Sequence, residues 1–225
     1  MSEAPARNPV SRPLRVAVLA SGRGSNLRAL IEAQKRGQLA IELVGVFSDK
    51  PDCGAIALAQ EYGVANNAIP PKGFRSREDF DSVLFGAIAA VQPDLIVCAG
   101  YMRIISEAAV RRFEGRMINI HPSLLPKYPG LDTHARALAA GDSEHGASVH
   151  LVIPALDAGP VLAQVRVTVQ ADDTPETLAR RVLAREHALL VQSVAWLAER
   201  HASVRGTEFR LGGQFLPAPL DSELR

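Results

Sequence analysis

The sequence predicts an α/β protein built on an open, mostly parallel, twisted sheet with helices on both faces. From residue 14 onward, short apolar runs alternate with segments whose apolar residues recur at helical spacing, as in repeated strand–helix–strand units. One run, Leu95 to Cys98, is entirely apolar, which is typical of a strand covered on both faces. A last long run, Pro160 to Val169, is expected as an antiparallel strand at the sheet edge. With 225 residues, the chain is long enough for one such domain around one core.

The individual elements follow from apolar spacing and from residues that begin or end helices. The expected strands are runs rich in valine, leucine and isoleucine and cover residues 14–20, 41–48, 64–69, 95–98, 117–121, 147–153 and 160–169. The expected helices have apolar residues three and four apart and cover residues 26–36, 55–62, 76–90, 107–113, 133–140 and 175–199. The Gly212-Gly213 pair between Phe209 and Phe215 predicts a terminal hairpin and then an unstructured end. We therefore assign residues 14–204 to one domain and 205–225 to a C-terminal hairpin or tail.

Charge balance and cysteine usage restrict the class of function. Lys and Arg number 25 against 24 Asp and Glu, so no overall field attracts nucleic acid or an acidic membrane surface. Cys53 and Cys98 form no Cys-x-x-Cys spacing, which favours a reducing, cytoplasmic location. The six histidines show no His-Glu-x-x-His pattern, so we expect no metal site. Residues 1–13 lack an apolar core segment and are expected to form a disordered leader, neither a signal peptide nor a membrane span.

The strand expected at residues 117–121 ends in two polar residues on one face. Side chains alternate across a strand, so Asn119 and His121 point to the same side. Pro122 cannot continue a central strand, which places His121 where the strand ends and a loop begins. Ligands bind at this edge of an open parallel sheet. The alternative is that both residues are hydrogen-bonded interior groups without a role in binding.

A glycine-rich turn between the first strand and the first helix is a candidate anion site. In Ser21-Gly22-Arg23-Gly24-Ser25-Asn26 the glycines let the backbone approach a phosphate, and Ser25 is the expected N-cap of the helix. A dinucleotide fingerprint requires a third glycine where Leu27 stands, so the turn suits a monophosphate. The alternative is a tight turn without a ligand.

Four further features carry polar groups in positions that need an explanation. Arg77 lies in the first turn of a helix, where a cation is disfavoured, so it is either solvated or bound to an external anion. Asp157 lies at the tip of a tight loop and is either a turn residue or faces His121. Glu186 falls on the apolar stripe of the longest helix and either joins a local network or points into the site. His150, inside a strand, is interpreted as structural.

Five motifs together resemble the folate-dependent phosphoribosylglycinamide formyltransferase family from about Leu14 to Trp196: SGRGSNL, YMRI, NIHPSLLPKYPG, HGASVH and LDAGP. The resemblance implies a Rossmann-like formyltransferase fold and transfer of a formyl group from 10-formyltetrahydrofolate, without a metal, to the amine of 5-phosphoribosylglycinamide in de novo purine biosynthesis. It further implies a catalytic trio of Asn119, His121 and Asp157. It also implies substrate contacts from Gly24, Ser25, Asn26 and Glu186, and folate contacts from Arg77, Met102, Arg103, Ile104, Ile105 and Asn119.

The resemblance also implies roles for the trio. Asn119 would donate to a developing oxyanion, and a protonated His121 would donate to it as well and then pass a proton to the leaving nitrogen. Because a nearby carboxylate stabilises an imidazolium, we expect Asp157 to raise the pKa of His121. Asp132 stands where some members have a histidine, which bears on the charge of a loop near the folate.

Other functions remain open at this point. Formyltetrahydrofolate hydrolase shares the trio but usually carries an additional domain ahead of it. A methionyl-tRNA formyltransferase requires a further domain and a basic RNA surface. A non-catalytic nucleotide-binding module would not need the three polar residues together. The expected partners are small molecules, and the sequence is compatible with a monomer or a homodimer.

Overall fold

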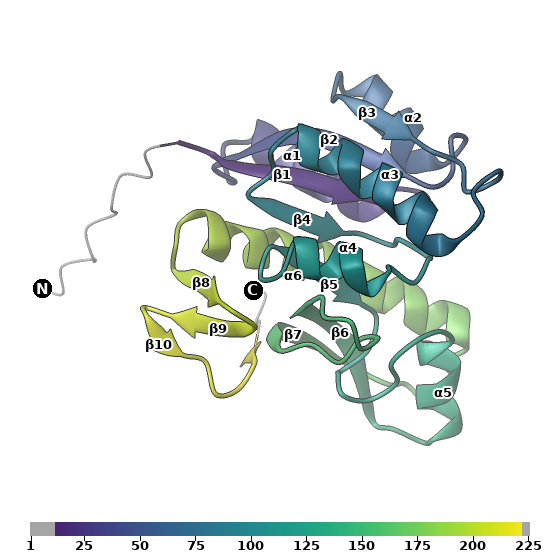
Figure 1. Ribbon diagram of the computed structural model, residues 1–225. Helices are drawn as coiled ribbons and strands as arrows, with labels where there is room; N and C mark the ends of the chain where they lie inside the picture. Colours follow the sequence, from purple (N-terminus) through teal and green to yellow (C-terminus); the bar gives the residue numbers. More distant parts are fainter. Residues whose placement is uncertain (1–11, 222–225) are drawn as a thin grey trace, which may run out of the picture.

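A large mixed sheet and a small antiparallel sheet organise the computed structural model, which describes residues 12–221 (Figure 1). The strands of the large sheet are β1 (Leu14–Leu19), β2 (Ile41–Ser48), β3 (Asn66–Ala68), β4 (Leu95–Cys98), β5 (Met117–His121), β6 (Glu144–Leu151), β7 (Val161–Thr168) and β11 (Leu220–Asp221). Their order is β11-β7-β6-β5-β4-β1-β2-β3. The small sheet contains β8 (Ala202–Arg205), β9 (Glu208–Leu211) and β10 (Gln214–Phe215).

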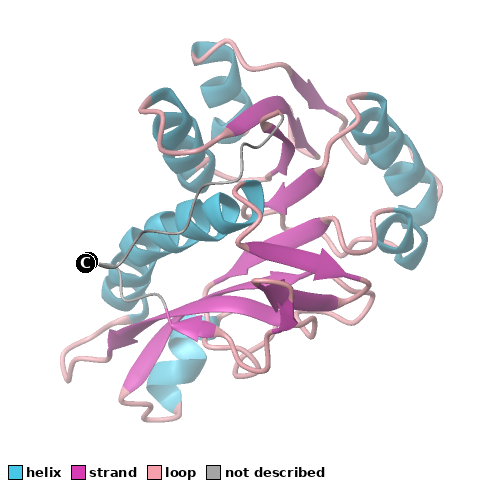
Figure 2. Ribbon diagram, turned by 90° about the vertical axis from the view of Figure 1, so that its left-hand side faces the viewer, coloured by secondary structure: helices cyan, strands magenta, loops and turns pink. Residues whose placement is uncertain are grey.

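Helices cover both faces of the large sheet, as the sequence predicted (Figure 2). They are α1 (Ser25–Lys35), α2 (Gly54–Glu61), α3 (Arg77–Ala90), α4 (Glu107–Arg112), α5 (Thr133–Ala139) and α6 (Pro175–Ala198). Alternate side chains of β1 point to the two faces of the sheet. Val16 and Val18 pack with α1, α2 and α6 on one face, whereas Ala17 and Leu19 pack with α3 and α4 on the other. The longest helix, α6, begins at the capping box of Thr174 and Thr177, with Pro175 in its first turn.

One strand of the large sheet, β6, runs against all the others and lies inside the sheet; β7, expected as an antiparallel edge strand, pairs antiparallel with β6 but has β11 outside it. The pairs of β1 with β2, β1 with β4, β2 with β3 and β4 with β5 are parallel. Strand β6 is antiparallel to both β5 and β7, and β11 adds a short parallel pair outside β7. Five consecutive strands are therefore parallel, and the mostly parallel α/β class predicted from the sequence is confirmed.

The two ends of the chain differ from the expectations. Arg12, assigned to the leader, donates to both carboxylate oxygens of Asp94 at 2.9 and 2.8 Å, and residues 1–11 of that leader lie outside the described part. The hairpin predicted around Gly212-Gly213 is present as β9 and β10, and β8, which begins at Ala202, adds a third strand ahead of it. The expected unstructured end is wrong for Leu220 and Asp221, which pair with β7, and residues 222–225 lie outside the described part.

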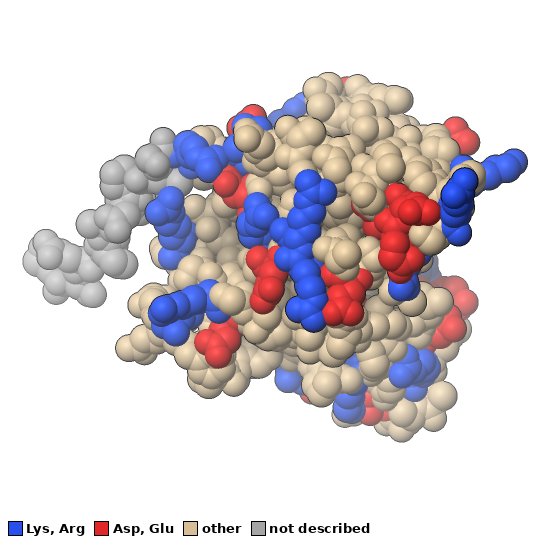
Figure 3. All heavy atoms as spheres, in the orientation of Figure 1, with Lys and Arg blue, Asp and Glu red and all other residues tan. Residues whose placement is uncertain are grey.

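Surface charges of both signs lie side by side, in keeping with the near-neutral net charge. On the face shown in Figure 3, basic and acidic side chains adjoin at several places, and neither sign forms one continuous patch. The contact between Arg111 and Glu107, one turn apart on α4, is an example at 2.6 Å. Within residues 12–221, no helix combines the length and the apolar character that crossing a membrane requires.

Candidate active site

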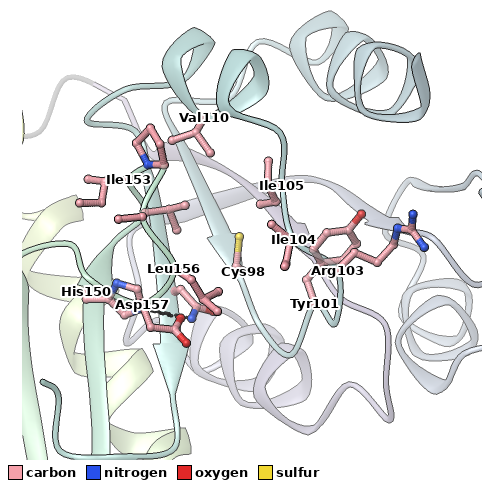
Figure 4. Close-up of a pocket in the computed structure, with 14 residues that line it drawn as sticks. Cys98, Tyr101, Arg103, Ile104, Ile105, Val110, His150, Ile153, Leu156 and Asp157 are labelled. Carbon is pink, nitrogen blue, oxygen red and sulfur yellow. Dashed lines mark hydrogen bonds and ion pairs between the residues drawn. The ribbon is translucent and has the colours of Figure 1, made fainter. Parts of the chain in front are cut away.

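A pocket lies at the carboxyl ends of β4 and β5, where Cys98 and Asn119 line it, and Figure 4 shows it with Cys98 labelled. Its floor is formed by the ends of β4 and β5, and its walls by the loop after β4 and the loop after β6. Most lining side chains are apolar, and the polar ones lie on two sides, with His150 and Asp157 on one and Tyr101 and Arg103 on the other (Figure 4). The lining comprises Cys98, Tyr101, Arg103, Ile104, Ile105, Val110, Asn119, His150, Val152, Ile153, Pro154, Ala155, Leu156 and Asp157.

Asn119 has one amide hydrogen engaged and one available. Its Nδ2 lies 3.1 Å from Nε2 of His150, the residue directly opposite on the antiparallel strand β6. Nδ1 of His150 lies 2.9 Å from the carbonyl oxygen of Leu151, which can only accept, so Nδ1 carries the proton. In the uncharged ring, Nε2 of His150 then accepts from Asn119. The second N–H of Asn119 is left to donate to a ligand.

His121 is buried where β5 ends, as predicted, and both of its ring nitrogens face acceptors. Nε2 lies 2.9 Å from the carbonyl oxygen of Tyr128 and so donates to it. Nδ1 lies 3.4 Å from a carboxylate oxygen of Asp157. The structure thus brings His121 and Asp157 together. It also shows that Nδ1 is the nitrogen that can gain or lose a proton.

The expectation of a raised His121 pKa is wrong. Burial of the ring, the largest effect, lowers the pKa below its usual value, and His150 and Arg136 act in the same direction. The hydrogen bond to Tyr128 and the charge of Asp157 oppose this shift without overcoming it. The sequence indicated that the carboxylate of Asp157 lies near His121, but it did not indicate how far burial removes water from the His121 ring.

Asp157 is held as a carboxylate by its surroundings. Burial disfavours its charge, but the hydrogen bonds and charges that face it lower its pKa nonetheless. They include the backbone N–H of Gly130 at 2.8 Å, with His121 at 3.4 Å and His150 at 3.6 Å. The backbone φ of 48° at Asp157 is rare for a non-glycine residue and turns the side chain toward the Gly130 N–H and the two histidine rings. Asp157 therefore connects two histidines with the loop that follows β5.

The glycine-rich turn leads from β1 directly into α1, as predicted, with one correction to the start of the helix. Gly24, not Ser25, is the N-cap of α1, and it has a φ of 81°. A Cβ at Gly24 would lie 2.8 Å from Cα of Ala55, so the position excludes larger residues. The turn is tied to the pocket because Ser21 donates its backbone N–H to Gly100 at 3.0 Å, while its Oγ accepts from the N–H of Met102 at 3.0 Å.

Glu186 reaches this turn from α6. One of its carboxylate oxygens accepts from Nδ2 of Asn26 at 3.2 Å, and both residues are buried. Burial raises the pKa of Glu186, and the hydrogen bond from Asn26 opposes the shift. In the described part of the chain, Oδ1 of Asn26 is buried and has no hydrogen-bond partner. The two alternatives for Glu186 therefore coincide: its local network lies at the candidate anion site.

The residues expected to contact folate fall into two groups. Arg103, Ile104 and Ile105 line the pocket, and the guanidinium of Arg103 lies 5.0 Å from the ring centre of Phe80 on α3. Met102 is not among the lining residues, and its side chain is 64% exposed. Arg77 is absent from the lining as well, and its guanidinium pairs with Glu78 at 3.2 Å. Asn119 lines the pocket as well, so the pocket includes four of the six expected folate contacts.

Two groups of the site were not identified from the sequence. His150 was interpreted as structural, although it contacts both Asn119 and Asp157. The carbonyl of Tyr128 carries no signal in the sequence, because every residue has one. The sequence spacing does not indicate a role for His150. Only the register between β5 and β6, which places Asn119 opposite His150, would have identified it.

A second pair of histidines behind the site should make stability depend on pH. Burial, together with His134 3.1 Å away, lowers the pKa of His145 from 6.5 to about 4. Between pH 6.5 and pH 4 the folded state binds fewer protons at His145 than the unfolded state. The contribution of His145 to the free energy of unfolding is therefore fully present above pH 6.5 and is lost as the pH falls toward 4. A shift of this size corresponds to roughly 3 kcal/mol. Denaturant unfolding from pH 8 to pH 4 should show the loss in the wild type and a weaker loss in His145→Gln; equal slopes would contradict it. His201→Gln, at an exposed site, is the control.

Comparisons with known proteins agree with this geometry. A family model described as formyl transferase matches residues 14–194. The phosphoribosylglycinamide formyltransferase of Escherichia coli (strain K12) is 43% identical over 204 residues, which cover 91% of this chain and 96% of that protein. The solved phosphoribosylglycinamide formyltransferase of Coxiella burnetii has a TM-score of 0.88 at 45% identity and covers 93% of this chain and 100% of that one.

A more distant solved structure is the formyltetrahydrofolate deformylase of Burkholderia mallei. It has a TM-score of 0.80 at 28% identity, over 90% of this chain and 70% of that one. The family match runs from the first residue of β1 to near the end of α6 and includes every residue of the site described above. The chain belongs to the formyl transferase family.

Proposed function

We propose that the protein transfers the formyl group of 10-formyltetrahydrofolate to the amine of 5-phosphoribosylglycinamide. The products are the N-formyl compound and tetrahydrofolate, and the reaction is a step of de novo purine biosynthesis. The observation that carries this proposal is that Asn119 and Asp157 line an apolar pocket, while His121 lies beside the pocket with its Nδ1 3.4 Å from Asp157. The relatives from Escherichia coli (strain K12) and Coxiella burnetii, at 43% and 45% identity, bear the name of this activity.

Asn119 is proposed to stabilise the charge that develops on the formyl oxygen. When the amine attacks the formyl carbon, the carbonyl oxygen gains negative charge. The N–H of Asn119 that His150 does not accept is available to donate to this oxygen. His150 therefore acts as a positioning residue, because it fixes the direction of the amide.

His121 is proposed to act first as a base and then as an acid. Because its pKa is lowered, the ring is uncharged at neutral pH and Nδ1 has a free lone pair. Nδ1 can take the proton that the attacking amine loses and give it to the N10 of the folate as the bond from the formyl carbon to N10 breaks. Asp157, 3.4 Å from Nδ1, stabilises the imidazolium formed between these steps. No covalent bond to the enzyme is required.

The pocket and the turn suit the two reactants. Apolar side chains on both walls fit a flat ring system, and Tyr101 and Arg103 have buried polar atoms that lack partners within the described residues. These atoms, the phenol oxygen of Tyr101 and Nε of Arg103, can bind polar groups of a folate. The turn at Gly24, Ser25 and Asn26 would hold the substrate phosphate at the N-terminus of α1. Arg77 and Met102 stay predicted folate contacts at the periphery.

Glu186 is proposed to contact the ribose of the phosphorylated substrate. Glu186→Gln should raise the KM of that substrate roughly tenfold, because hydrogen bonds to a charged acceptor are the stronger ones. The free energy of unfolding should not fall, since the change removes a buried charge that has one hydrogen bond. Steady-state kinetics and denaturant unfolding measure the two quantities, with exposed Glu61→Gln as control. A loss of stability with unchanged KM would restrict Glu186 to a structural role.

An assay of formyl transfer tests the proposed function directly. Purified protein is mixed with 10-formyltetrahydrofolate, and the appearance of tetrahydrofolate is followed with and without 5-phosphoribosylglycinamide. The proposal requires release that depends on the amine and an N-formyl product in equal amount. Release of formate without the amine would instead assign the hydrolase activity for which the Burkholderia mallei relative is named. No turnover under either condition would support a binding module.

A further inference from the structure

We propose that Gln164 on β7 is a positioning residue for His121. This inference rests on the proposed function, in which His121 transfers protons through Nδ1. Gln164 touches neither His121 nor the pocket of Figure 4. Its side-chain amide holds the loop that follows β5, and that loop supplies the acceptor for the other nitrogen of His121.

The amide of Gln164 makes two contacts to this loop and its support. Gln164 is 6% exposed, and its Nε2 donates to the carbonyl oxygen of Leu125 at 2.8 Å and to Oγ of Ser148 at 2.9 Å. The Oγ of Ser148 also accepts from the N–H of Leu125 at 3.0 Å and donates to the carbonyl oxygen of Ser123 at 2.6 Å. The hydroxyl of Ser148 is therefore saturated, with two donors and one acceptor around it. Gln164 and Ser148 together fix the backbone of the loop from β6 and β7.

The anchored backbone continues directly to Tyr128. Oγ of Ser123 donates to the carbonyl oxygen of Lys127 at 2.6 Å, and the N–H of Lys127 donates to Leu124 at 3.0 Å. The next carbonyl, that of Tyr128, accepts from Nε2 of His121 at 2.9 Å. Tyr128 has a φ of 56°, a strained value for a large side chain, which persists only where the surroundings hold the backbone. A displaced Leu125 peptide would be transmitted to this carbonyl through the short loop.

The position of the Tyr128 carbonyl decides which nitrogen of His121 titrates. A carbonyl can only accept, so it keeps the proton on Nε2 and leaves Nδ1 for proton transfer beside Asp157. Without this acceptor, the charge of Asp157 would favour the tautomer with a proton on Nδ1. In that tautomer Nδ1 has no lone pair with which to take a proton from the amine. Gln164 thus acts on the reaction through the tautomer of His121.

The test compares Gln164→Met with Gln34→Met. Both changes remove a side-chain amide that donates to a backbone carbonyl while preserving length; Gln34 donates to Ile41 at 3.0 Å, away from the site. In Gln164→Met, we expect kcat to fall on the order of 10- to 100-fold, as for small misplacements of reacting groups, with both KM values within about threefold. In Gln34→Met, kcat should be unchanged.

Nitrogen-15 NMR of the His121 ring provides a readout that does not need activity. In the wild type at pH 8, the proton should reside on Nε2, and in Gln164→Met a substantial fraction should move to Nδ1. A wild-type ring protonated on Nδ1 would overturn the inference even if no variant folds. An unchanged tautomer and kcat in a folded Gln164→Met, with only a lowered Tm, would overturn it as well. Failure of the proposed function is separate, because it would show as absent transfer by the wild type.

Discussion

Replacing Asn119 by alanine should lower kcat about 100- to 1000-fold, the usual effect of removing one oxyanion donor. The amide is positioned by His150 on the neighbouring strand, and its second N–H is the one that would bind the formyl oxygen. Because the oxygen gains charge only as the amine attacks, the interaction is stronger in the transition state than with bound substrate. Both KM values should therefore stay within about threefold of the wild type.

A matched control separates this effect from a general loss of an amide. Asn66 on β3 is exposed and donates its Nδ2 to the carbonyl oxygen of Val64 at 3.1 Å, far along the sheet from β5. Asn66→Ala should leave kcat unchanged. A change confined to KM in Asn119→Ala would mean that Asn119 binds the folate without stabilising the transition state.

Gly24→Ala should lower stability and weaken binding of the phosphorylated substrate together. The φ of 81° disfavours alanine, and its Cβ would lie 2.8 Å from Cα of Ala55, so the turn or α2 must shift. The combined cost is roughly 2–5 kcal/mol, the sum of left-handed strain and overpacking. The displaced N–H groups should raise the KM of the phosphorylated substrate at least about tenfold, while the KM of the folate changes little.

Gly37→Ala is the control for backbone strain alone. Gly37 ends the same helix with a φ of 70°, and a Cβ there would have no atom within 4 Å. It should cost about 1–2 kcal/mol and leave both KM values unchanged. Equal effects of Gly24→Ala on the two KM values would count against a phosphate at this turn.

The fold was predictable where local signals and burial agree. Three strands end at the predicted residues: β2 at Ser48, β4 at Cys98 and β5 at His121. Pro122 marks the end of β5, and this one boundary places His121 at the sheet edge. The mostly parallel sheet follows from helices between successive strands, which requires no knowledge of distant contacts.

The remainder depends on pairings between distant segments. The sequence does not state that β6 inserts antiparallel between β5 and β7, and this pairing alone places His150 opposite Asn119. The pairing of Leu220 with β7 is of the same kind, because two residues carry too weak a pattern to indicate a strand. The prediction of a raised His121 pKa was wrong for a related reason. Burial depends on many neighbouring residues from distant parts of the chain, whereas the motif indicated only one carboxylate.

The central claim is that Asp157 is the charge partner of His121. Titrating the ring resonances of His121 by NMR tests this claim most directly, in the wild type and in Asp157→Asn, which preserves size and removes charge. Because burial lowers the pKa and Asp157 opposes that effect, the wild-type pKa should lie below that of a free histidine and the Asp157→Asn value lower still. An unchanged or raised pKa in Asp157→Asn would contradict the account and reduce Asp157 to a residue of the turn.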